Sequence, residues 1–190
     1  MKIGLYFGSF NPIHNAHLII ANHILNEALV DKIWLIVSPH NPLKETSSLL
    51  DENDRYFLVS TAVEDDDRLK ASNIEFSQPR PSYTAVTLAH LSEKYPQYEF
   101  SVIMGSDSFQ NIRRWKNFDF ILKHYKVLVY MRPGFDVKDS LGGNVHLLPA
   151  PLLELSATAI RSLIREKKSL RYMLPDKVIA EIEKAGYYKK

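Results

Sequence analysis

The sequence predicts an α/β protein built on a three-layer, doubly wound, mostly parallel, Rossmann-like sheet. Two observations favour this fold class. Short apolar runs rich in β-branched and aromatic residues, typical of buried strands, recur along the chain, and most are separated by segments with apolar residues at helical spacing. Alternating strands and helices fold into parallel sheets with right-handed crossovers. Because no repeat or linker-like stretch interrupts the pattern, we expect a single domain over residues 1–190.

The first predicted strand, 3–7, is an unbroken apolar run. Gly8, Asn11 and Pro12 end it, and apolar residues at three- and four-residue spacing predict a helix from about Asn15. Residues 32–38 are rich in β-branched and aromatic side chains and predict a second buried strand. The prolines that follow predict a loop, because proline suits neither a helix interior nor a central strand.

The middle of the chain continues the alternation. Residues 51–64 combine helical spacing with an acidic first turn, which suits the positive end of a helix dipole. Residues 69–76 alternate loosely and predict a strand, and 79–84 predict a turn. Ser82 or Thr84 is expected to cap a helix that runs to residue 95. The apolar run 98–104 predicts the next strand.

The last third predicts two more strands and several helices. A short helical stretch is expected around Trp115, and a helix over 118–124 precedes a strand over 125–131. A shorter apolar run predicts a strand at 145–148. Ser156 is a suitable N-cap for the next helix, and Pro175 is favoured at the start of the final one.

Composition excludes several classes of protein. The chain has 24 basic and 22 acidic residues, a net charge of +2, so we expect neither a nucleic-acid nor a membrane partner. It has no cysteine, which excludes a disulfide framework and suits the cytoplasm. The N-terminus runs directly into a strand, which leaves no room for a signal peptide, and no apolar run approaches the length of a membrane span. We therefore expect a cytoplasmic protein.

Polar residues of the kind used in phosphate chemistry follow four of the predicted strands. They comprise Gly8, Ser9, His14 and His17; Asn41 and Lys44; Gly105 and Asp107; and Ser156, Thr158 and Arg161. The carboxyl ends of parallel strands meet at one edge of a sheet, where helix N-termini favour anions, so these residues predict a phosphate site. Each has an ordinary alternative: the histidines can lie on a plain βα turn, Lys44 in solvent, and Asp107 at a helix cap. Zinc is disfavoured because cysteine and a third suitably spaced histidine are missing.

Two motifs make the resemblance specific. Residues 8–17, GSFNPIHNAH, resemble the G-x-F-x-P-x-H-x-G-H motif of the nucleotidyltransferase superfamily, and 155–161, LSATAIR, resemble its I-S-x-T-x-I-R motif. Ala16 and Leu155 depart from the usual glycine and isoleucine. Between the motifs, 38–44, 81–84, 105–107 and Trp115 are similar to the pattern of bacterial nicotinate-nucleotide adenylyltransferases, as is the ending 172–187.

The resemblance implies a reaction and its site residues. Nicotinate mononucleotide attacks the α-phosphorus of ATP in line, giving deamido-NAD and pyrophosphate, without a protein nucleophile. The implied catalytic residues are His14, His17, Lys44 and Arg161. The implied ATP ligands are Gly8, Ser9, Phe10, His17, Gly105, Asp107, Ser156, Thr158 and Arg161. The implied pyridine-nucleotide ligands are Asn41, Lys44, Thr84, Trp115 and Arg132.

Mg²⁺ is expected to be carried by the triphosphate, without protein metal ligands. Whether the protein forms a homo-oligomer is left open.

Three rival interpretations also stay open. The first is another nucleotidyltransferase, such as a phosphopantetheine adenylyltransferase or a cytidylyltransferase. The second is a sensor that binds nucleotide without turnover, and the third is a fragment of an aminoacyl-tRNA synthetase. Trp115 has its own alternative, since an indole on a helix is often part of the core. The preference for nicotinate over nicotinamide depends on the resemblance alone, because the sequence does not show where main-chain amides point.

Overall fold

A six-stranded sheet forms the centre of the computed structural model, which describes residues 1–39, 49–151 and 153–189. The strands are β1 (Lys2–Gly8), β2 (Lys32–Val37), β3 (Leu69–Ser72), β4 (Glu99–Gly105), β5 (Lys126–Tyr130) and β6 (Val145–Leu148). Their order is β3-β2-β1-β4-β5-β6, and every neighbouring pair is parallel. The strand order reverses between β1 and β4, which is where doubly wound sheets bind ligands. The predicted fold class is confirmed.

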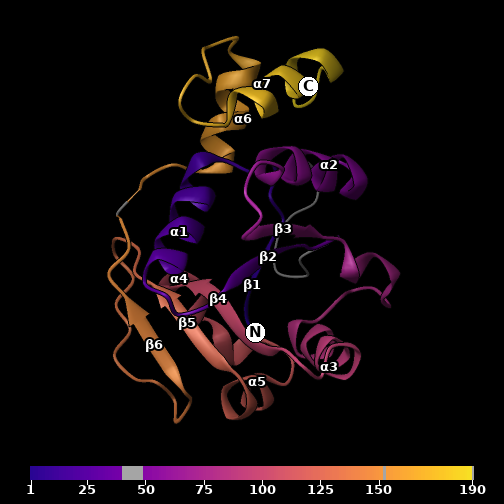
Figure 1. Cartoon of the computed structure of the whole chain (residues 1–190). Helices are drawn as coiled ribbons and strands as arrows, with labels where there is room; N and C mark the ends of the chain where they lie inside the picture. The colour runs from indigo at the N-terminus through magenta and orange to yellow at the C-terminus, as the bar shows by residue number, and fades with distance from the viewer. Residues whose placement is uncertain (40–48, 152, 190) are drawn as a thin grey trace.

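Helices cover both faces of this sheet (Figure 1). They are α1 (Asn15–Asn26), α2 (Glu52–Val63), α3 (Thr84–Lys94), α4 (Ser106–Gln110), α5 (Phe118–His124), α6 (Ala157–Arg165) and α7 (Asp176–Ala185), with 3₁₀ turns η1 (Ile74–Ser77) and η2 (Ile112–Arg114). Helices α1 and α2 lie on one face, and α3 and α5 lie on the other. The result is the expected three-layer arrangement.

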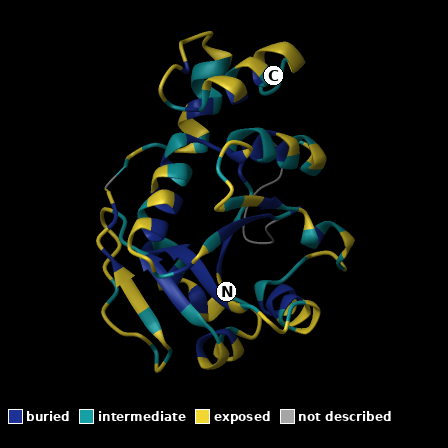
Figure 2. Cartoon of the chain, viewed as in Figure 1, coloured by how far each residue is buried: buried dark blue, intermediate teal, exposed yellow. Residues whose placement is uncertain are grey.

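The alternation of side chains along β1 assigns residues to the two faces. Ile3 and Leu5 pack in the cluster that contains Leu88 of α3 and Ile121 of α5. Tyr6 points to the opposite face and packs with Ile24 of α1 and its neighbours. Figure 2 shows the inner strands mostly as dark blue, whereas the helices carry yellow and teal residues as well. Burying each such large apolar side chain contributes about 1.5–3 kcal/mol, so both faces stabilise the central strand.

The C-terminal helices extend the α2 side of the molecule. Ile160 of α6 and Val178 and Ile182 of α7 share one apolar cluster with Leu58 of α2 and Leu35 of β2. The segment between the two helices also contacts the start of α1, because the Asn15 backbone N–H donates to the Met173 carbonyl at 2.9 Å. These contacts hold the last part of the chain against its first turn.

Three element predictions need correction. The strand expected over 69–76 ends at Ser72, because the chain turns into η1 to place Glu75 under α3. Neither Ser82 nor Thr84 caps α3: Tyr83 is the N-cap residue, without a side-chain cap, and the Ser82 hydroxyl donates to Glu75 instead. The helical stretch expected around Trp115 ends just before it, at Arg114.

Candidate active site

Two adjoining cavities open at the carboxyl edge of the sheet, where the strand order reverses. One has a volume of about 350 Å³ and is lined by residues of β1, α1, β5 and α6. The other has a volume of about 570 Å³ and is lined by residues of β1, β4, β5 and the start of α3. Gly8, Ser9 and Tyr130 belong to the walls of both cavities. Two molecules bound in these cavities would therefore meet above the end of β1.

His14 and His17 stand together in the first cavity. His14 is the N-cap residue of α1, with an extended backbone, and His17 lies one turn into the helix. Their rings stack with centroids 3.7 Å apart, and the His14 backbone N–H donates to His17 Nδ1 at 3.3 Å. Phe10 meets the His17 ring edge-on, at 5.1 Å between centroids. The turn thus holds both imidazoles beside each other in the wall of the first cavity.

Burial determines the charge of His14. The side chain is buried, and burial, with a smaller effect of the Arg132 charge, lowers its pKa to about 4. His14 is therefore neutral at pH 7 in the ligand-free protein. Its Nδ1 is buried and has no hydrogen-bond partner among the described residues. A bound polyanion would favour the protonated ring, because an opposite charge nearby raises the pKa of an imidazole.

Arg161 reaches the same cavity from the far end of the chain. Its Nη1 donates to the Asn11 carbonyl at 2.8 Å, and its Nη2 donates to Thr158 Oγ1 at 3.3 Å. Ser156 begins the helix: its hydroxyl accepts from the Ala159 backbone N–H at 3.2 Å. Ser156 and Thr158, to which the resemblance gives a role in binding ATP, both line the cavity. A helix N-terminus and a guanidinium therefore face one space, which suits an anion.

Asp107 and Arg132 both line the first cavity and form an ion pair, with Arg132 Nη1 3.0 Å from Asp107 Oδ2. The other carboxylate oxygen is buried and has no partner within the described residues. A Cβ on Gly105 would collide with the Asp107 carboxylate and crowd Arg132, so a larger residue there would displace this ion pair. Arg132, predicted to bind the pyridine nucleotide, lines the first cavity beside the predicted ATP ligand Asp107.

Gly8 has a packing role besides the expected close approach of a ligand. A Cβ at this position would lie 2.8 Å from the Phe10 ring. Phe10 itself is almost completely buried and adopts a positive φ of 44°. The glycine thus makes room for the ring that supports His17. Ala16, at the position where glycine is usual in the motif, is also buried and lines the first cavity.

The second cavity is the more aromatic of the two. Thr84 and Trp115, both predicted pyridine-nucleotide ligands, line it together with Tyr83 and Lys116. Lys116 Nζ lies 4.4 Å from the centre of the Tyr83 ring. Trp115 is partly buried against the core as well, so its two interpretations are compatible: one part of the indole packs and another borders the cavity.

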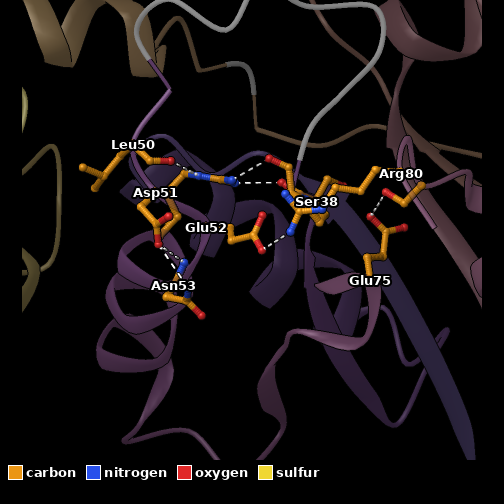
Figure 3. A network of polar contacts seen from close by, with 10 residues as sticks. Ser38, Leu50, Asp51, Glu52, Asn53, Glu75 and Arg80 are labelled. Atoms are coloured by element: carbon orange, nitrogen blue, oxygen red, sulfur yellow. Dashed lines mark hydrogen bonds and ion pairs between the residues drawn. The ribbon is translucent and has the colours of Figure 1, made fainter. Parts of the chain in front are cut away.

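Sequence reasoning missed four residues around these cavities. Tyr6 and Tyr130, whose hydroxyls are 3.0 Å apart, line both cavities. Glu75 lines the second cavity, and the buried Arg55 donates to the carbonyls of Ser9 and Ser38, which line it as well (Figure 3). The sequence offers one signal for Arg55: it is a charged residue on the apolar side of a predicted helix. The predicted ligands Asn41 and Lys44 lie outside the described residues.

In the part of the chain that the structure describes, no three His, Asp or Glu side chains lie close enough to hold a metal ion. No described helix has the length and apolar character needed to cross a bilayer.

Comparison with known proteins first gives the class. Residues 5–163 match the model of the cytidylyltransferase-like family, so the chain is a nucleotidyltransferase of this kind. Among solved structures, nicotinic acid mononucleotide adenylyltransferase of Plasmodium falciparum complexed with NaAD superposes with a TM-score of 0.84 at 20% identity, covering 98% of this chain and 97% of that one. A putative nicotinate-nucleotide adenylyltransferase from Vibrio parahaemolyticus gives 0.73 at 20% identity, covering 100% and 96%. These likenesses support the fold.

Curated relatives then give the particular family. Probable nicotinate-nucleotide adenylyltransferase of Flavobacterium psychrophilum is 48% identical over 193 residues, covering all of both chains. The protein of the same name from Cytophaga hutchinsonii is 48% identical, covering 99% of this chain and 98% of its own. The chain belongs to the nicotinate-nucleotide adenylyltransferase family.

Proposed function

We propose that the protein transfers the adenylyl group of ATP to nicotinate mononucleotide, giving deamido-NAD and pyrophosphate in NAD biosynthesis. The observation that carries the proposal is the pair of adjoining cavities with different linings. The first presents imidazoles, a guanidinium and a helix N-terminus, which suit a triphosphate, and the second presents aromatic side chains, which suit a pyridine ring. Their shared wall at Gly8 and Ser9 would bring the two phosphates together.

His14, His17 and Arg161 are the proposed catalytic residues in the first cavity, with Lys44 as a fourth. No side chain needs to form a covalent bond, because the acceptor phosphate attacks the α-phosphorus directly and pyrophosphate leaves. The imidazoles would donate to the transferring phosphoryl group, where charge develops. Arg161 and the N-terminus of α6 would hold the leaving pyrophosphate, and Asp107 would accept from ribose hydroxyls.

The acceptor would lie in the second cavity. Trp115 would stack on the pyridine ring, and backbone N–H groups near Thr84 would bind the nicotinate carboxylate. Arg132 and Asn41 stay proposed ligands of the acceptor nucleotide. Because Arg132 is paired with Asp107 in the ligand-free protein, substrate binding would have to replace that ion pair with contacts to ribose and phosphate.

A divalent cation, which we propose to be Mg²⁺, would enter with ATP. The protein offers few suitable ligands, since no cluster of three His, Asp or Glu residues is present within 1–39, 49–151 and 153–189. Phosphate oxygens would therefore supply most of its ligands. When bound, the cation neutralises charge on the triphosphate.

A cytoplasmic location and a homo-oligomer stay predictions. Cell fractionation would check the location, and light scattering would check the oligomeric state.

Pyrophosphate release from Mg-ATP tests the proposal, with nicotinate mononucleotide, nicotinamide mononucleotide and phosphopantetheine as separate acceptors. We expect strong release with the nicotinate compound. Release with phosphopantetheine alone would keep the phosphate chemistry and contradict the acceptor. ATP binding without release in the presence of any acceptor would favour a nucleotide sensor.

A further inference from the structure

Two phenol groups stand where the two cavities adjoin. The described residues that line both cavities are Tyr6, Phe7, Gly8, Ser9, Ser108 and Tyr130. The two tyrosines are the largest polar side chains in this set. In the proposed reaction the phosphoryl group leaves a molecule in one cavity and joins a molecule in the other, so a polar group in the shared wall lies beside its path.

The sheet brings these two side chains together from strands that are not neighbours. Tyr6 lies on β1 and Tyr130 ends β5, with β4 between them (Figure 1). Both rings pack on the α1 face of the sheet. Strands two places apart are separated by about 10 Å, so the side chains meet only because they lean toward each other over β4. A Cβ on Gly105 of β4 would lie 3.1 Å from Tyr130 Cζ, so the glycine leaves room for that ring.

The hydrogen bond between the two phenols uses only one of their two protons. The Tyr6 hydroxyl donates to the Tyr130 hydroxyl oxygen at 3.0 Å. Tyr130 has a proton of its own, which no described residue accepts. Burial raises the pKa of both phenols, so each keeps its proton at neutral pH. Tyr6 is buried and Tyr130 is half-buried, so the Tyr130 hydroxyl is the one that can donate to a bound ligand.

Aromatic contacts hold the phenol pair next to His17. The Tyr6 ring meets the rings of Phe10 and His17 edge-on, at 5.9 Å and 6.0 Å between centroids. It meets the Tyr130 ring edge-on at 6.0 Å as well. The pair is therefore fixed beside an imidazole that we propose to bind the transferring phosphoryl group. Donors that are already in place need no rearrangement at the moment of reaction.

We propose that the Tyr130 hydroxyl, oriented by Tyr6, is a catalytic donor to the phosphoryl group that passes between the two cavities. The inference rests on the proposed function and adds a residue to its site. An oxygen of the acceptor phosphate bonds to the α-phosphorus while the bond to pyrophosphate breaks, and charge lies on the non-bridging oxygens. The hydroxyl donates to one of these oxygens and keeps its proton throughout. Tyr6 acts through Tyr130 and is a positioning residue.

Removal of the Tyr130 hydroxyl should slow turnover. We expect Tyr130→Phe to lower kcat about tenfold, as for the loss of one hydrogen bond. The KM of each substrate should change less than about threefold, because the contact is made mainly while the phosphoryl group is in transit. Tyr6→Phe keeps the ring beside His17 but no longer orients Tyr130, and we expect a loss of about threefold in kcat. The double variant should resemble Tyr130→Phe alone, because Tyr6 acts only through Tyr130.

Tyr125→Phe is the matched control. Tyr125 lies just before β5, at the end opposite to Tyr130, and its hydroxyl is 3.0 Å from Ser92 Oγ. It lines neither cavity. The change deletes the same atom and breaks the same kind of bond, so it measures the structural cost alone. Melting temperatures of the two variants should fall by similar amounts, while Tyr125→Phe keeps the wild-type kcat. The proposal is overturned if Tyr130→Phe loses no more kcat than this control, or if it changes only one KM.

Binding of deamido-NAD separates this inference from the proposed function, because calorimetry needs no turnover. The diphosphate of the dinucleotide has to span the junction of the cavities. Tyr130→Phe should therefore bind deamido-NAD about fivefold more weakly and nicotinate mononucleotide as well as the wild type does. A wild-type protein that binds the dinucleotide but releases no pyrophosphate from the two substrates would contradict the enzyme. The dinucleotide would still test the donor, and equal affinities of wild type and Tyr130→Phe would then overturn it. A wild-type protein that does not bind deamido-NAD would overturn both proposals.

Discussion

At the scale of single residues, the two histidines of the first motif are held by different means. His17 is flanked by Phe10 and by the stacked His14 ring, which fix its orientation. His14 is buried at the helix start, where its ring nitrogen Nδ1 has no partner among the described residues. A buried polar group without a partner destabilises the protein. In the proposed function, a phosphate of the substrate would supply that partner.

The depressed pKa of His14 predicts a pH-dependent loss of stability. Between pH 6.5 and about 4 the unfolded chain binds a proton at His14 that the folded chain does not bind, so stability falls as pH falls through this window. From pH 7 to pH 5 the loss should be about 2 kcal/mol. His14→Gln should remove that part of the slope. Urea unfolding at both pH values checks it, and parallel pH dependence of the two proteins would contradict it.

His17→Ala should lower kcat about 10²-fold or more, with a smaller effect on KM, as expected for the loss of a donor that acts mainly in the transition state. Steady-state rates of pyrophosphate release measure it. His90→Ala is a suitable control, because His90 is exposed on α3. Near-normal turnover of the His17 variant would remove this residue from the catalytic set.

At the scale of elements, turn geometry decides which side chains reach the cavities. The 3₁₀ turn η2 ends at Arg114 and releases the chain into an extended conformation at Trp115. The indole therefore borders the second cavity while it still packs on the core. A continuous helix through this position, as the sequence predicted, would place the residue differently.

Trp115→Ala should raise the KM of nicotinate mononucleotide about tenfold, which corresponds to the loss of one stacking interaction of roughly 1–3 kcal/mol. The KM of ATP and kcat should change little, and Trp115→Phe should recover most of the affinity. Initial rates with each substrate varied in turn measure both constants. A change confined to the KM of ATP would show that the stacking role is wrong.

The sequence predicted the strands and main helices well, since apolar runs and helical spacing are local signals. It failed where a distant contact decides the local structure. Residues 74–77 turn away from the sheet because the Glu75 carboxylate accepts a hydrogen bond from Thr87, which lies 12 positions further along the chain. No local sequence pattern predicts that hydrogen bond. Arg55 was missed for a related reason: its partners are carbonyls, which every residue carries. The motif residues, by contrast, were predicted from their resemblance to known motifs, and the structure brings His14, His17 and Arg161 together in one cavity.

At the scale of the whole molecule, one apolar cluster joins the C-terminal helices to the sheet. Val178 and Ile182 of α7 and Ile160 of α6 pack with Leu35 of β2. Tyr187 adds a hydrogen bond to Asp54 of α2 at 2.9 Å. Because these helices carry Arg161 and depend on the sheet for burial, we expect them to unfold together with it.

Unfolding should therefore be one cooperative transition, as predicted for a single domain over residues 1–190. Ile182→Ala should destabilise the whole protein by about 2–5 kcal/mol, as large-to-small core substitutions do. Differential scanning calorimetry checks both points, since the van't Hoff and calorimetric enthalpies should agree. A separate low-temperature transition in the variant would contradict the prediction and identify the C-terminal helices as a second unit.

The bond from Arg161 to the Asn11 carbonyl, which spans 150 residues, has a consequence for the newborn chain. A ribosome that adds about 5–20 residues per second needs roughly 8–30 s to travel between these two positions. During that interval the first motif has emerged without Arg161, the guanidinium of the proposed anion site. The proposed function therefore implies a delay during translation before the chain can bind nucleotide, and an unfinished chain released early would have the histidines without the arginine.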